Sequence, residues 1–276
     1  VIFLVTIASL RFWVRPKLVI LYLLAAPFFL GTGLPIIWGN ATRFFTVDII
    51  PSPLRNGEGI AGLASWLGEL LWYQALPGIG TTLVLTQIAL VGTGIVALLT
   101  FPLISRLFVD RFLQVPGHGL LIIGRSVPEY LLAYILLQLW GPSMLPAVVA
   151  LVIHNGTIIG HLIGRQSSEL KLRPDAVGGF NRYIYEVVPR LYRSFLAFLL
   201  YRWEIIMRET AILGILGITT LGFYVDSAIQ ELRFDRAMIL ILITALLNIA
   251  VDSLARAIRR QLQLRTTPTT QTPDQP

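Results

Sequence analysis

The polar side chains best suited to chemistry lie inside an apolar run, VIHNGTIIGH, at residues 152–161. His154 and His161 are seven residues apart, so on a helix they would share one face. A hydrolase within the membrane would need a nucleophile and a base, yet the chain has no cysteine, no paired aspartates in its apolar runs and no His-Glu metal motif. We therefore predict hydrogen bonds between helices for these side chains, with no catalytic residues, no metal site and no enzymatic activity in this chain.

Ionisable side chains occur in two further apolar segments, RSVPEYLLAY and YRWEIIMRETAILGILG. Such groups are costly inside a membrane unless they are paired or face water, so each is a candidate functional residue. Arg125 with Glu129, and Glu204 with Arg208, are four residues apart and can pair along one helix, whereas the other charges need a neighbouring helix, lipid headgroups or water. The set predicted to form intramembrane charge pairs or to line a translocation path is Arg125, Glu129, Asn155, Arg202, Glu204, Arg208 and Glu209.

The elements that must position these residues are membrane-spanning helices. Of the 276 residues, 55% are hydrophobic and 13% are charged, and the mean hydropathy is +0.73. Several apolar runs reach the length of about 20 residues that a helix needs to cross a bilayer. The sequence thus predicts an all-α, polytopic membrane helical bundle of about six transmembrane helices, at residues 18–38, 79–105, 120–140, 143–163, 194–222 and 237–257.

Three regions follow from this pattern: an N-terminal cytoplasmic segment at 1–17, a transmembrane domain at 18–258 and a disordered cytoplasmic tail, rich in Thr, Pro and Gln, at 259–276. Lys and Arg gather before the first predicted span, between the fourth and fifth, and after the sixth. The positive-inside rule then places both termini of this multi-pass membrane protein in the cytoplasm. The basic residues flank lipid spans, which argues against a nucleic-acid partner.

The longest polar connection on the cytoplasmic side is the loop 165–189, between the fourth and fifth predicted spans. SSELKL can form a short helix capped by Ser167 or Ser168, and the glycine pair permits a turn before FNRYIYEVVPRL resumes the helix. A short amphipathic helix held between two spans can act as a lever. An ordinary solvated loop is the alternative.

The chain resembles permease subunits of type I ABC importers, most closely those of the phosphonate-uptake branch. The residues that carry the resemblance are RSVPEYLLAYIL, LYRWEIIMRETAILGILG, GFYVDSAIQELRFDRAMILILI and VDSLARAIRRQL, with TLVLTQIALVGTGIVALLTFPL in the second span. The similarity extends over residues 79–262. The resemblance implies the type I importer permease fold and a loop 165–189 that carries a coupling helix, which seats on a cytoplasmic ATPase.

By this resemblance, the residues expected to couple to the ATPase are Glu169, Leu172, Pro174, Asp175, Gly178, Gly179, Tyr183, Glu186 and Pro189. The implied partners are ABC ATPase subunits, a second permease subunit in a homodimer or heterodimer, an extracytoplasmic substrate-binding protein and membrane lipid. The sequence has no phosphate-binding loop, so ATP and Mg²⁺ would bind to the partner ATPase and this chain would bind no cofactor.

The resemblance implies alternating-access import of a phosphonate or a related small oxyanion, by a protein of the bacterial inner membrane. The loop departs from the family pattern, because PDAVGG and EVVP are closer together than the corresponding family elements and no residues match the Glu-Ala pair of the family. Gly178 or Gly179 can match the family glycine, and Pro189 the closing proline. Three alternatives stay open: a membrane scaffold, a degenerate non-transporting half of a heterodimer, and an importer of another small solute.

Overall fold

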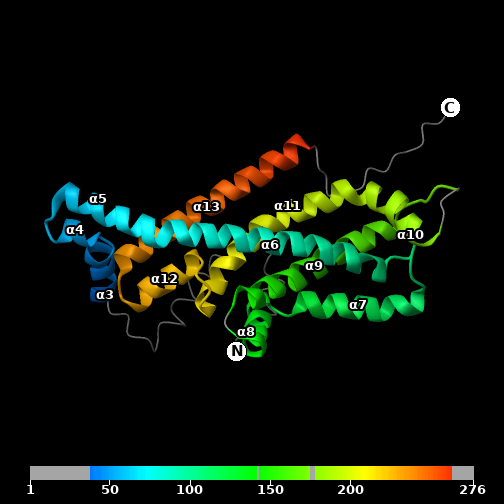
Figure 1. Ribbon diagram of the computed structural model, residues 1–276, viewed down its shortest axis with the longest axis horizontal. Helices are drawn as coiled ribbons and strands as arrows, with labels where there is room; N and C mark the ends of the chain where they lie inside the picture. Colours follow the sequence, from blue (N-terminus) through cyan, green and yellow to red (C-terminus); the bar gives the residue numbers. More distant parts are fainter. Residues whose placement is uncertain (1–37, 142, 175–177, 263–276) are drawn as a thin grey trace, which may run out of the picture. The chain divides into compact units, whose positions relative to one another are not determined.

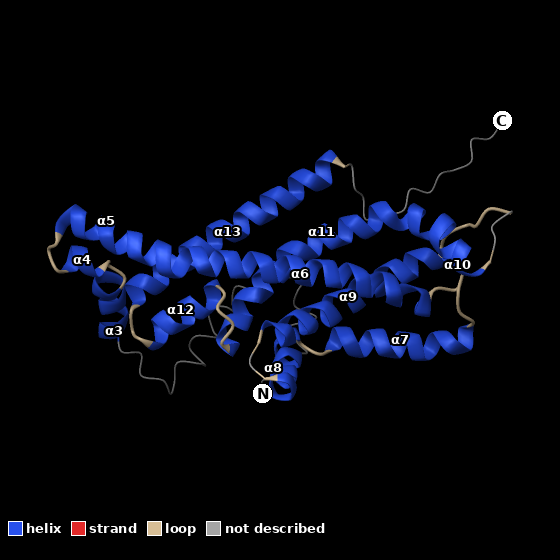
Figure 2. Ribbon diagram, in the orientation of Figure 1, coloured by secondary structure: helices blue, strands red, loops and turns tan. Residues whose placement is uncertain are grey.

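A computed structural model describes residues 38–141, 143–174 and 178–262, and these residues form helices and connecting loops without a β-strand (Figures 1 and 2). The chain divides into two units, Val1–Ile49 and Ile50–Pro276. In the first unit, α3 (Trp38–Arg43) continues into a π-helical turn, Phe44–Asp48. The segment 1–17, residues 18–37 of the first predicted span and all but the start of the tail 259–276 lie outside the described residues.

The second unit opens with a short helix, α4 (Ser52–Arg55), which is followed by a long continuous helix (Figure 1). This helix comprises α5 (Gly59–Leu70), a π-helical turn (Leu71–Ala75), α6 (Leu76–Thr100) and a closing 3₁₀ turn (Phe101–Ile104). It is long and apolar enough to cross a membrane, and it contains nearly the whole of the predicted span 79–105. The helix extends well beyond that prediction because α5 joins α6 without a break.

The predicted span 120–140 is broken by a bend. The structure has two helices there, α7 (Arg111–Ser126) and α8 (Glu129–Trp140), whose axes differ by 90°. The bend falls at Val127 and Pro128. A residue before proline is sterically driven out of the helical conformation, and Val127 has the extended backbone angles φ −77° and ψ 121°.

The helix α9 (Met144–Ser168) confirms the predicted span 143–163 and extends it by more than a turn. It packs closely on α6 through small residues that recur every fourth position, Gly156, Gly160 and Gly164. A methyl group at Gly160 would collide with the Thr100 hydroxyl, and one at Gly156 would lie 2.7 Å from Val96 Cγ1. Small residues at such a spacing allow membrane helices to approach closely and gain van der Waals contact.

The predicted fifth span, 194–222, has a different course in the structure. A short helix α10 (Gly179–Asn181) and a π-helical turn (Arg182–Val187) lead into α11 (Val188–Leu213), which closes in a 3₁₀ turn (Gly214–Leu216). The chain then turns at Gly217, whose φ of +85° favours glycine, and α12 (Leu221–Gln230) continues at an angle of 43°. The span therefore starts earlier than predicted and ends before residue 222.

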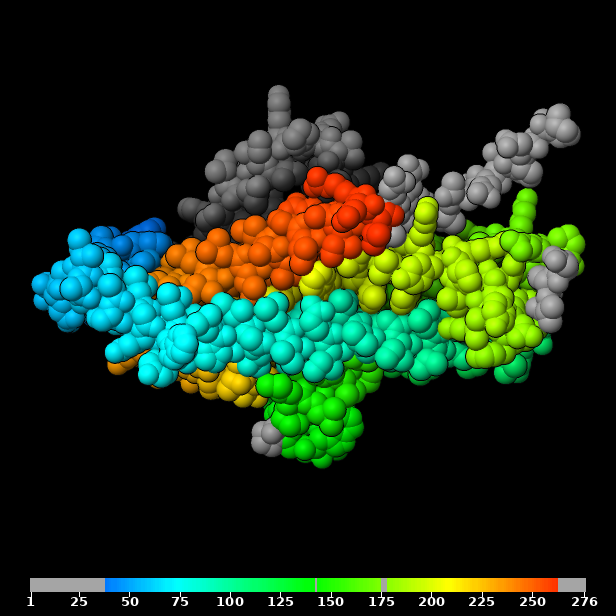
Figure 3. Space-filling view, turned by 45° about the horizontal axis from the view of Figure 1, so that its top comes forward, coloured from blue at the N-terminus to red at the C-terminus, as the bar shows by residue number. Residues whose placement is uncertain are grey.

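The last helix, α13 (Phe234–Gln261), contains the predicted span 237–257. In the described residues, three helices are long and apolar enough to cross a membrane, and two bent pairs meet the same test when each pair is taken together. Figure 3 shows α5 and α6 in cyan and α13 in orange to red on one face of the second unit. Large apolar side chains such as Val91, Leu246 and Ile249 are exposed on these helices, as expected for surfaces that lipid or another membrane chain covers.

Two buried clusters position the candidate site residues. One joins α6, α8, α9 and α11 through Leu85, Ala133, Leu151 and Ile206, all of which are 0% exposed. The other joins the end of α6 to the end of α9 and the start of α11 through Phe101, Ile163 and Val187. The first cluster joins the helices that contain the intramembrane polar residues, and the second supports the polar loop.

Candidate coupling loop and intramembrane polar cluster

The loop between α9 and α11 is tied together by the carboxylate of Glu186, which is almost entirely buried. Its Oε1 forms an ion pair with Arg190, one turn further along α11, and accepts a hydrogen bond of 3.3 Å from the backbone N–H of Arg173. The Arg173 side chain also lies 3.9 Å from Oε2. One buried acidic side chain thus joins the incoming half of the loop to the start of the outgoing helix.

Aromatic stacking fixes the same loop to the end of the α6 helix. The Tyr183 ring stacks on Phe101 at a centroid distance of 5.3 Å, and its hydroxyl donates a hydrogen bond of 3.0 Å to the carbonyl of Leu98. Tyr183 also stacks with Phe180, whose side chain is 74% exposed. The Arg182 guanidinium adds a hydrogen bond of 3.0 Å to the carbonyl of Leu107. The loop is therefore held by specific contacts.

The predicted coupling residues differ in their burial and contacts. Glu186 and Tyr183 make the contacts that hold the loop, and Leu172 is partly buried against the cluster that contains Phe101, Ile163 and Val187. The exposed positions are Glu169, Pro174, Gly178, Gly179 and Pro189, whereas Asp175 lies outside the described residues. Gly179 has φ +68°, which accounts for the glycine there. Sequence reasoning missed the stacking on Phe101, which comes from a helix far away along the chain.

Three of the predicted intramembrane residues come together where α8, α9 and α11 meet. Glu129 begins α8, Asn155 lies in the middle of α9, and Glu209 lies near the end of α11. The Asn155 side chain, which is 0% exposed, donates a hydrogen bond of 2.9 Å to Glu209 Oε2. Glu209 thus has a hydrogen-bond partner on another helix, one of the options expected from the sequence.

The predicted Arg125–Glu129 pair is replaced by a contact between helices. Because the bend at Val127 and Pro128 separates Arg125 from Glu129, the Glu129 carboxylate turns to His154, with Oε2 3.8 Å from Nε2. The other ring nitrogen, Nδ1, lies 3.0 Å from the carbonyl of Val127. Sequence reasoning assigned His154 to hydrogen bonding between helices but did not pair it with Glu129.

The predicted Glu204–Arg208 pair does form, with Arg208 Nη2 3.1 Å from Glu204 Oε1. The Arg208 side chain is 60% exposed on the surface of α11. Arg202 is half-buried on the same helix, within electrostatic range of Glu209 and Glu129. An exposed charge within a membrane helix is unfavourable next to lipid tails. We therefore expect this face of α11 to contact water or another protein surface.

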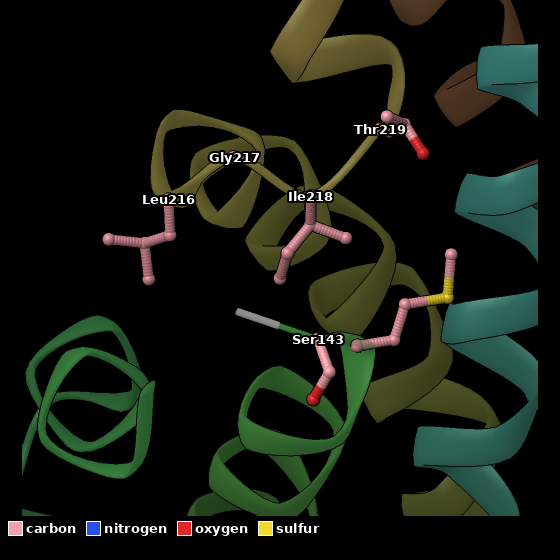
Figure 4. A pocket seen from close by; sticks show the side chains of 6 residues that line it. Ser143, Leu216, Gly217, Ile218 and Thr219 are labelled. Atoms are coloured by element: carbon pink, nitrogen blue, oxygen red, sulfur yellow. The ribbon is translucent and has the colours of Figure 1, made fainter. Parts of the chain in front are cut away.

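A small cleft lies between the start of α9 and the turn that follows α11. Its volume is about 140 Å³, and it is lined by Ser143, Met144 and residues 216–219. Figure 4 shows Ile218 pointing toward the beginning of α9, where Ser143 lies. The lining is mostly apolar. Neither Glu129 nor His154 is among the residues that line the cleft.

These long apolar helices, with charged residues inside them and a structured loop between two of them, fit a multi-pass membrane protein. The sequence matches the family described as binding-protein-dependent transport system inner membrane component over residues 99–264, and the chain belongs to this family. The match contains α9, the loop 165–189, α11 and α13. It confirms the resemblance to ABC importer permeases that the sequence motifs indicated.

Among its relatives, the phosphate-import permease protein PhnE of Mycolicibacterium smegmatis is 25% identical over 230 residues, which are 79% of this chain and 43% of PhnE. The phosphite transport system permease protein PtxC of Stutzerimonas stutzeri is 23% identical over 145 residues, which are 50% of this chain and 53% of PtxC. The chain thus covers about half of the length of either relative.

Among solved structures, the chain resembles a subunit in a crystal structure of an amino acid ABC transporter with histidines. The TM-score is 0.57 and the sequences are 15% identical, with 73% of this chain and 97% of that chain covered. At this identity the likeness establishes the fold, which is that of an ABC transporter permease.

Proposed function

We propose that this chain is the permease subunit of an ATP-driven importer for a phosphonate, phosphate or phosphite, working by alternating access. The observation that carries the proposal is the family match over 99–264, together with similarity to permeases whose names specify phosphate and phosphite. The chain itself performs no bond chemistry in this proposal. ATP and Mg²⁺ bind to a partner ATPase, and an extracytoplasmic binding protein delivers the oxyanion.

The loop 165–189 is the proposed contact with the ATPase. Its internal ties, Glu186 to Arg190 and Tyr183 to Phe101, support a role in which force on the loop reaches the ends of the membrane helices. Exposed aromatic side chains next to these ties, Phe180 and Tyr185 at 74% and 77% exposure, offer an apolar surface to a partner. Interfaces are enriched in such aromatic anchors.

The face of α11 with Glu204 and Arg208 is the proposed wall of the pathway, or its contact with a second permease subunit. Charged side chains within membrane helices almost always face a water-filled cavity or the interior of a bundle. Arg208 would there supply positive charge to a passing oxyanion.

Because these 276 residues contain no cysteine, water access can be tested directly. We expect Arg208→Cys in the assembled transporter to react with a charged, water-soluble thiol reagent, and Leu246→Cys, 65% exposed on the apolar surface of α13, to stay unlabelled. Labelling is read by mass spectrometry. Protection of Arg208→Cys together with labelling of Leu246→Cys would contradict the assignment of the pathway to α11.

The substrate class is tested by uptake. The transporter, reconstituted in proteoliposomes with its ATPase and binding protein, should accumulate radiolabelled phosphate, phosphite or methylphosphonate when ATP is supplied. Sulfate and a neutral amino acid serve as controls. Accumulation of the amino acid alone would exclude an oxyanion importer, and assembly without any uptake would favour a scaffold or a non-transporting half.

A further inference from the structure

The Glu129–His154 contact is one edge of a larger group of possible metal ligands. Glu129, His154 and Glu209 each offer one ligand atom, and these atoms all lie within 4.8 Å of one another. The three side chains are half-buried and come from α8, α9 and α11. Two ligand atoms of a tetrahedral zinc ion, with bonds of about 2.1 Å, lie roughly 3.4 Å apart, so a small movement would bring all three within bonding distance.

The orientation of His154 independently fits a metal ligand. A carbonyl can only accept a hydrogen bond, so Nδ1, 3.0 Å from the carbonyl of Val127, carries the proton. The lone pair of Nε2 in the neutral ring then points to the side of Glu129, at a distance of 3.8 Å that is too long for a hydrogen bond. Metal-binding histidines almost always donate their second N–H to a carbonyl or carboxylate in this way.

Asn155 gives a further indication. It is 0% exposed, and its amide nitrogen donates to Glu209 Oε2 at 2.9 Å and to the carbonyl of Leu151 at 3.1 Å. Its oxygen is buried without a hydrogen-bond partner in the described part of the chain. A buried polar atom without a partner is costly. Asn155 thus orients one carboxylate of the group and adds an unsatisfied oxygen beside it.

The local charge favours a cation. Two carboxylates, those of Glu129 and Glu209, lie close together here, with the Arg202 guanidinium within electrostatic range of both. Burial and mutual repulsion both disfavour the ionised form of such carboxylates, and a divalent cation bound between them would offset that cost.

We propose that Glu129, His154 and Glu209 form a binding site for a divalent transition-metal ion, with Zn²⁺ as the best match to one imidazole and two carboxylates. Asn155 positions Glu209, and the carbonyl of Val127 positions His154. The site links α8, α9 and α11. Its position depends on the bend at Pro128, which turns Glu129 toward α9.

The test is Zn²⁺ binding to the purified full chain in lipid nanodiscs, measured by calorimetry and by metal analysis after dialysis. We expect one Zn²⁺ per chain, with Glu209→Gln and His154→Gln each weakening binding by at least tenfold. Arg202→Met should tighten binding, because it removes a positive charge close to the carboxylates. Glu231→Gln, an exposed acidic position between α12 and α13, should bind like the unmodified chain.

The imidazole pair on α7 and α9 provides the decisive comparison. His118 and His161 have ring centroids 5.8 Å apart and could themselves attract zinc. Loss of binding in His118→Gln but not in His154→Gln would overturn the proposal, and so would the absence of Zn²⁺ binding. If a variant fails to fold, the site can still be tested in the unmodified chain with Co²⁺ in place of Zn²⁺. Its absorption spectrum should then show a tetrahedral ion with nitrogen and oxygen ligands.

Discussion

Replacing Glu186 with alanine is expected to reduce transport by more than tenfold while the chain still inserts into the membrane. The substitution removes the carboxylate that joins Arg190 to the backbone of Arg173, so the link between the two halves of the loop is weakened to the hydrogen bond of 2.8 Å that Arg190 donates to the carbonyl of Lys171. Losing hydrogen bonds to a charged group costs about 1.5–3 kcal/mol, which is enough to populate other loop conformations. The measurement is ATP-driven uptake of labelled oxyanion into proteoliposomes, normalised to the amount of assembled complex.

The matched control is Glu231→Ala, which removes an exposed carboxylate from the connection between α12 and α13. Its paired arginine is also exposed, and such pairs contribute about 0–1 kcal/mol, so uptake should stay close to that of the unmodified chain. Equal uptake by Glu186→Ala and Glu231→Ala would show that the buried carboxylate has no part in coupling.

Replacing Gly160 with leucine is expected to prevent folding of the bundle. The α6–α9 contact is the most extensive between helices in the described structure, and at Gly160 a side chain would meet the Thr100 hydroxyl, with Leu121 at 3.3 Å. Overpacking of a tight core costs about 1–3 kcal/mol even when the added group is small, and leucine adds four carbon atoms. Size-exclusion chromatography in mild detergent should show aggregation in place of a monodisperse peak.

Gly119 offers the control, because no atom lies within 4 Å of the position that a Cβ would take there. It is also a helical glycine, on α7, so Gly119→Leu makes the same chemical change without the collision. We expect this variant to elute as a single peak. A monodisperse, transport-active Gly160→Leu protein would refute the close approach of α6 and α9.

Long apolar runs made part of this fold predictable from sequence. Residues 143–163 and 237–257 are mostly apolar and have no proline in the middle, and the structure has helices over both. The bend within the span 120–140 was not predicted because hydropathy averages over Val127 and Pro128, where the backbone must leave the helix. Pro128, directly before Glu129, was the sequence feature that could have indicated the bend.

The candidate site was predictable only where partners share a helix. The Glu204–Arg208 pair follows from a spacing of four residues, and it forms. The partners of Glu129 and Glu209 belong to another helix, and a single sequence contains no information on which faces of two helices meet. The stack of Tyr183 on Phe101 was missed for the same reason.

The proposed coupling function is tested most directly by ATP hydrolysis. The chain is purified in nanodiscs with a candidate partner ATPase and binding protein, and hydrolysis is measured with and without oxyanion-loaded binding protein. We predict stimulation in the unmodified complex and its loss when Phe180 and Tyr185, the exposed aromatics of the loop, are replaced by aspartate. Failure of the chain to assemble with the ATPase, or stimulation that is unchanged by these substitutions, would contradict the role of the loop as the coupling element.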